Sequence, residues 1–120
     1  MTRESLTAFN AFYTNHNQIQ EKYTSYLKEV FDHLAGDPNV IGFNPMSNAP
    51  PGNSFLKPSL LAPGVADRKN LTPLYEKAFK ILQNSNRKAL MWFEPTSHTD
   101  AIPIFSGIVT PVGFEQAPGA

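Results

Sequence analysis

The chain has 120 residues, enough for one modest hydrophobic core. Ten basic residues balance ten acidic ones, so no strong field attracts nucleic acid and we expect no nucleic-acid partner. Cysteine is absent, which excludes disulfides and thiolate metal ligands. The histidines His16, His33 and His98 lack any metal-ligand spacing, so we expect no metal and no cofactor.

The apolar residues are spread through the chain and form no long apolar segment. No run approaches the roughly 18–20 residues of a membrane-spanning helix, so we expect no transmembrane segment. No apolar stretch follows Met1, so we also expect no secretory signal. The residues alone assign no compartment.

Helical periodicity predicts a first long helix from about Gln18 to Leu34. Gly36 stands where a C-terminal cap is expected, and Pro38 prevents the helix from continuing. A short helical turn is also predicted around Leu6–Tyr13.

The next segment, Asn39–Met46, is rich in β-branched and aromatic residues and predicts a buried strand. A long loop is expected over residues 47–71, with too many apolar side chains for an idle linker. A second helix is predicted to start with Thr72 as N-cap and Pro73 at the first helical position.

The apolar run Ala89–Phe93 predicts a second buried strand. Trp92 could stack on a sugar, but its place inside this apolar run favours the core. Residues 96–120 are expected to form a second long loop, with a short strand near Ile104–Val109. Two buried strands joined through a helix indicate an α/β fold with a parallel βαβ unit. In such units the functional residues gather at the carboxyl ends of the strands, here Met46–Pro50 and Phe93–His98.

Several stretches of the sequence resemble glycoside hydrolase family 5, most closely the endoglycoceramidases. The resemblance rests on the stretches Val40–Asn53, Leu60–Leu71, Pro73–Lys77, Phe93–Pro95 and Val112–Gly119. In that family the fourth strand runs into an Asn-Glu-Pro motif, often followed by an aromatic residue, a Pro and a Gly. The resemblance implies that residues 1–120 form an incomplete hydrolase domain, a partial (β/α)8 TIM-barrel fragment with two to three parallel βα units.

The resemblance also implies a mechanism that this chain does not complete. Family members cleave the bond between a glycan and ceramide with retention, using two carboxyl groups about 5–5.5 Å apart. Ala49 stands at the position of the acid/base Glu, and the nucleophile is expected beyond residue 120. Asn48 matches the neighbouring Asn, which binds a sugar hydroxyl in the family. No catalytic residue is therefore expected to be intact, and we expect this chain alone to be inactive.

Three further positions are candidates for substrate contact. His98 follows the second strand, and Phe55 and Leu60 lie in the long loop, where they could form a wall beside the lipid or simply cap the rim. Glu94 is placed where a catalytic group would be plausible, but we expect it to serve as a structural strand terminus.

Three interpretations remain open. The chain is a truncated endoglycoceramidase-like copy without activity, a non-catalytic module that binds glycan or glycosphingolipid, or one piece of an interrupted gene for an active enzyme. The family is typically secreted or vesicular, so the resemblance implies such a compartment. Because two or three strands leave unpaired ladder edges, we also expect self-association of the isolated chain.

Overall fold

The structure is a computed structural model that describes residues 2–86, 88–96, 114 and 118–119. Three α-helices and two short strands alternate with short helical turns in the described part of the chain. In chain order the elements are α1 (Arg3–Tyr13), a 3-10 turn (His16–Gln18), α2 (Ile19–Leu34), β1 (Gly42–Phe43), a 3-10 turn (Pro58–Leu61), a π-helical turn (Asp67–Leu71), α3 (Thr72–Ser85) and β2 (Leu90–Met91).

The two long helices predicted from periodicity are confirmed. Helix α2 ends at Leu34 as expected, and Leu27 and Phe31 form its buried face. The predicted N-cap of α3 is wrong, because the chain is already helical before Thr72. The hydroxyl of Thr72 donates to the carbonyl of Asp67 at 3.0 Å, so the π-helical turn feeds directly into α3. The loop predicted over 47–71 is therefore partly helical.

The two strands lie side by side and parallel, with Gly42 opposite Leu90 and Phe43 opposite Met91. Helix α3 connects them, so a βαβ arrangement is confirmed within the described residues. The strands are much shorter than predicted, because few residues pair: Leu90 N–H donates to Ile41 at 3.0 Å, and Trp92 N–H donates to Phe43 at 2.9 Å.

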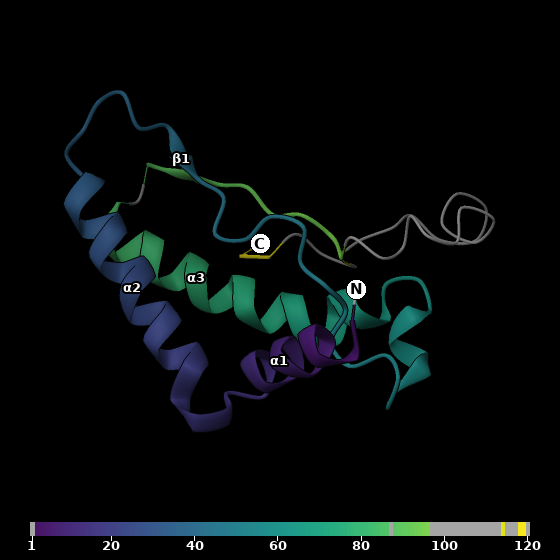
Figure 1. Cartoon of the computed structure of the whole chain (residues 1–120). Coiled ribbons are helices and arrows are strands. Elements are labelled where there is room, and N and C mark those ends of the chain that lie inside the picture. Colours follow the sequence, from purple (N-terminus) through teal and green to yellow (C-terminus); the bar gives the residue numbers. More distant parts are fainter. Residues whose placement is uncertain (1, 87, 97–113, 115–117, 120) are drawn as a thin grey trace.

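Helices α2 and α3 cover only one face of this strand pair (Figure 1). Phe43 and Met91 pack on the core side, against a cluster of Leu27, Phe31, Ala78, Leu82 and Ala89. Side chains on the other face are open: Leu90 is 59% exposed and Trp92 is 44% exposed. The prediction that Trp92 belongs to the core is thus wrong, and the strands are buried on one face rather than two.

The C-terminal part of the chain is described at few positions. Phe114 packs edge-on against Tyr75 and Phe93, with ring centroids 5.7 and 5.0 Å apart. The short strand expected near Ile104–Val109 lies outside the described residues, as does most of the expected loop 96–120.

Gly42 provides a test of the strand pairing. A Cβ at this position would lie 2.2 Å from the carbonyl oxygen of Leu90, whereas a Cβ at Gly36 would meet nothing within 4 Å. We expect Gly42→Ala to lower the free energy of unfolding by about 1–3 kcal/mol, the usual cost of overpacking. Gly36→Ala is the matched control and should leave urea unfolding nearly unchanged; equal effects of the two would contradict this pairing geometry.

Candidate functional site

A polar cluster forms where the two parallel strands end. The carboxylate of Glu94, which follows β2, accepts hydrogen bonds from three groups that follow β1. These are the side-chain amide of Asn44 at 2.6 Å, the hydroxyl of Ser47 at 3.1 Å and the backbone N–H of Asn48 at 3.2 Å. We call these four residues the rim cluster.

The hydrogen bonds of the rim cluster stabilise the charged form of Glu94. The backbone N–H of Asn48 and the amide of Asn44 hold the pKa of Glu94 below its usual range, against a smaller desolvation effect. Ser47 adds to the same shift. Glu94 is therefore ionised at neutral pH, with a carboxylate whose orientation is fixed by the segment after β1.

The segment after β1 accepts hydrogen bonds from three tyrosine hydroxyls, one from each α-helix. Tyr13 donates to the carbonyl of Pro50 at 2.7 Å, and Tyr75 donates to the carbonyl of Met46 at 2.9 Å. Tyr23 donates to the carbonyl of Pro45. We call these three residues the tyrosine clamp.

Tyr75 links the clamp to both strand ends. Its hydroxyl also accepts the backbone N–H of Glu94 at 3.2 Å. Burial raises the pKa of Tyr75, and burial likewise raises the pKa of Tyr23 to about 12 and that of Tyr13 further. The clamp hydroxyls therefore stay protonated, and able to donate, well beyond neutral pH.

The long loop is tied to the same segment. The amide of Asn70 donates to the carbonyl of Pro51 at 2.7 Å. Asp67 is fully buried and accepts the backbone N–H of Thr96 at 2.8 Å. Its second carboxylate oxygen is buried without a hydrogen-bond partner within the described part of the chain. The loop thus connects the segment after β1 to the residues that follow β2.

The structure separates the two residues proposed from the Asn-Glu-Pro pattern. Asn48 is exposed in the rim cluster and has a left-handed backbone, with φ 52°. Ala49 is only 1% exposed and packs with Leu71 and Tyr75 in a small core cluster. An open side-chain position therefore exists at residue 48, whereas residue 49 points into packed apolar groups.

The other residues predicted to contact substrate differ in how exposed their side chains are. Phe55 is 61% exposed, and Leu56 beside it is also exposed. Leu60 is only 5% exposed, so its side chain does not line an open surface in this structure. His98 lies outside the described residues.

Sequence reasoning missed most of the rim cluster. Asn44 and Ser47 are not among the predicted site residues, although Asn44 directly follows Phe43 and Glu94 directly follows Phe93 in two apolar runs. That similarity of position in two parallel strands was the available signal. The tyrosine clamp left no comparable signal, because its members are far apart in the chain.

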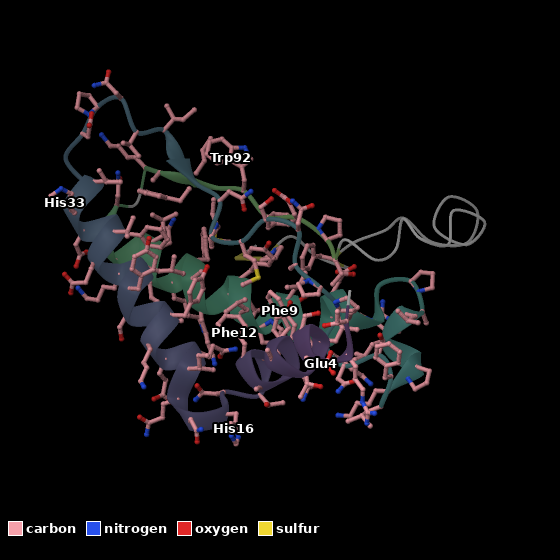
Figure 2. The ribbon with its side chains drawn as sticks, viewed as in Figure 1. Glu4, Phe9, Phe12, His16, His33 and Trp92 are labelled. Atoms are coloured by element: carbon pink, nitrogen blue, oxygen red, sulfur yellow. The ribbon has the colours of Figure 1, made fainter. Side chains whose placement is uncertain are left out.

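Metal and membrane features are absent from the described ranges. No group of three or more metal-ligating side chains occurs in the part of the chain that the structure describes. His16 lies in the 3-10 turn before α2, His33 lies in the last turn of α2, and both are exposed (Figure 2). No helix among the described residues has the length and apolar character required to span a membrane.

Two curated relatives that this chain resembles are both endoglycoceramidases. The chain is 30% identical over 112 residues to an endoglycoceramidase of Hydra vulgaris, covering 93% of the chain. It is 28% identical over 93 residues to an endoglycoceramidase of Cyanea nozakii, covering 78% of the chain. The chain spans about a fifth of the length of these relatives, 20% and 18% respectively. No family model and no solved structure matches it significantly.

The tyrosine clamp is testable at Tyr75. Tyr75→Phe leaves the carbonyl of Met46 and the N–H of Glu94 without their buried partner. We expect a loss of about 1–3 kcal/mol in the free energy of unfolding, measured by urea titration. Tyr26→Phe is the control, because Tyr26 is 62% exposed. A Tyr75→Phe chain as stable as this control would show that the clamp hydroxyl contributes nothing.

The rim cluster has a pH signature. Because the folded pKa of Glu94 is lowered, its contribution to stability is present above the unfolded pKa of about 4.3 and is lost as pH falls through the folded value. Asn44→Ala removes one donor and should move the pKa of Glu94 upward, as followed by carboxyl-carbon NMR titration. Asn84→Ala, an exposed amide at the end of α3, should leave it unchanged.

Proposed function

We propose that this chain is an endoglycoceramidase-like segment of glycoside hydrolase family 5 that contacts a glycosphingolipid but does not cleave it alone. In this proposal the two strands correspond to strands four and five of a (β/α)8 barrel, and residues 1–120 form an incomplete domain. The similarity to two endoglycoceramidases and the parallel βαβ arrangement support it. The polar cluster at the carboxyl ends of the strands also supports it, because barrel enzymes bind substrate there.

The proposed inactivity does not depend on the choice between two alignments. Matching the Asn of Asn-Glu-Pro to Asn48 puts the acid/base at Ala49. Counting back instead from Pro51-Gly52, the aromatic-Pro-Gly end of the motif, puts the acid/base at Asn48 itself. The exposed position of residue 48 favours the second alignment. Neither side chain is a carboxylic acid, and losing general acid/base help forfeits about 10²–10⁴-fold in rate.

The observation that carries the proposed inactivity is the state of Glu94. This residue is the carboxylate of the rim cluster, and it is unsuited to replace the missing acid. A general acid needs a pKa near the working pH, so that it holds a proton to give. The rim cluster does the opposite and lowers the pKa of Glu94. With three donors already bound, this carboxylate serves to order the rim. The expectation that Glu94 is a structural terminus thus becomes part of the proposal.

The lipid side of the proposed substrate would lie along the long loop. Phe55 and Leu56 are 61% and 68% exposed, and Leu61 is 39% exposed. Exposed apolar side chains in the loop that follows the polar rim along the chain match a ligand with a sugar head and an apolar tail. Leu60 is left out of this wall because it is buried.

A second candidate is that this sequence is one piece of an interrupted gene whose product is active. The short coverage of both relatives favours it, since four-fifths of their length has no counterpart here. In that case the unpaired edges and the open face of the strand pair would be covered by other strands. Self-association of the isolated chain through those edges stays a prediction.

Vesicles containing lactosylceramide test the proposal. We expect the purified chain to bind them saturably, to bind ceramide-free lipid vesicles weakly, and to release no lactose. Phe55→Ser with Leu56→Ser should weaken vesicle binding, whereas Ser59→Ala, an exposed change in the same loop, should not. Lactose released above the buffer blank would contradict the proposed inactivity. Equal binding to both kinds of vesicle would contradict the proposed glycolipid contact.

A further inference from the structure

The face of the strand pair that points away from the helices combines an aromatic surface with the rim cluster. Side chains alternate along a strand, so Leu90, Trp92 and Glu94 share one face of β2 and its extension. Trp92 and Glu94 are two residues apart on that face, about 6–7 Å along the strand. Figure 2 shows Trp92 on the side of the strands opposite α2 and α3.

The indole of Trp92 extends toward Gly42 on the neighbouring strand. A Cβ at Gly42 would lie 2.7 Å from the ring carbon Cζ3 of Trp92, so the ring fills the space that a side chain would otherwise occupy. The ring therefore lies over β1 while remaining 44% exposed. A large ring supported on one side and open on the other provides a flat apolar platform.

The polar end of this face retains capacity to bind. A carboxylate offers about four lone-pair positions, and Glu94 accepts three hydrogen bonds from the rim cluster. Asn44 uses its amide nitrogen for Glu94, and its amide oxygen accepts no hydrogen bond from the residues that the structure describes. Both residues thus present acceptors of fixed orientation next to the platform, where a hydroxyl-rich ligand would find partners.

We infer that Trp92, Glu94 and Asn44 form a saccharide subsite that holds one pyranose ring. The ring's apolar C–H face stacks on the indole, and its hydroxyls donate to Glu94 and Asn44. This inference rests on the proposed function and deepens it, because it names the residues and the part of the substrate that they hold. The ionised carboxylate disfavours an anion or a wholly apolar ligand, and the described residues offer no metal-ligand cluster there.

Trp92 is the sole tryptophan of the chain, so its fluorescence reports on this subsite directly. We expect lactose to shift the emission saturably and to protect the indole from acrylamide quenching. Sorbitol at the same concentration is the control. Because it is an open-chain polyol without a pyranose ring to stack, it should neither shift the emission nor protect the indole. This measurement uses the unmodified chain and does not depend on the folding of any variant.

Substitutions separate this subsite from the lipid wall. Trp92→Ala and Glu94→Gln should each weaken lactose binding by at least about tenfold by calorimetry, equivalent to about 1.4 kcal/mol. Tyr26→Ala is the matched control, because Tyr26 is an exposed aromatic residue on α2. Circular dichroism of each variant identifies any loss that comes from unfolding, and the quenching result then decides.

The outcomes distinguish the inference from the proposed function. Saturable binding of lactosylceramide vesicles with no effect of lactose on Trp92 would overturn the subsite and leave the proposed function standing. A lactose affinity that Trp92→Ala leaves unchanged in a folded chain would also overturn the subsite. Absence of binding to both lactose and the glycolipid would overturn both proposals.

Discussion

The hydrogen bonds from tyrosine hydroxyls to loop carbonyls are the constraint on which the rest of the structure depends. The segment after β1 contains Pro45, Pro50 and Pro51, which have no N–H and so prevent a regular strand ladder. Its carbonyls still need donors where they are buried. Each α-helix supplies one tyrosine to meet that need, so helix packing and loop conformation are fixed together.

The ordered rim follows from this arrangement. Tyr75 binds both the carbonyl of Met46 and the N–H of Glu94, so it sets the distance between the two strand ends. With that distance fixed, Asn44, Ser47 and Asn48 reach the carboxylate of Glu94 together. Because these donors already hold Glu94 in place, the proposed subsite needs little reorganisation, which lowers the entropic cost of the proposed binding.

Helices, strand positions and the parallel connection could be predicted from the sequence, because they follow from local periodicity. The burial of the strands could not be predicted from the sequence. Ala89–Phe93 is a continuous apolar run, and nothing in it shows that helices cover only one face of the strands. The same limit made Trp92 look like core. The start of α3 was misplaced because Thr72 and Pro73 form a good helix-start signal, which a preceding π-helical turn overrides.

The candidate site was predicted in outline and missed in detail for a related reason. Local sequence located the strand ends, and the resemblance drew attention to Asn48 and Ala49. Which of these two side chains is open depends on a left-handed residue at position 48, and Leu60 turns inward although Phe55 in the same loop does not. These choices are made by long-range contacts, such as that of Ala49 with Leu71 and Tyr75, which no local pattern records.

Binding and catalysis make separate demands on such a rim, and in our proposal the described residues meet the first without the second. Hydrolysis requires a group that holds a proton at the working pH, whereas holding a sugar requires acceptors of fixed orientation beside an apolar surface. The same three hydrogen bonds that fix the orientation of Glu94 also lower its pKa. Ordering this carboxylate therefore fixes the direction of its remaining acceptor position and makes it a poorer acid, so in the proposed function this rim orients a sugar hydroxyl without supplying a proton.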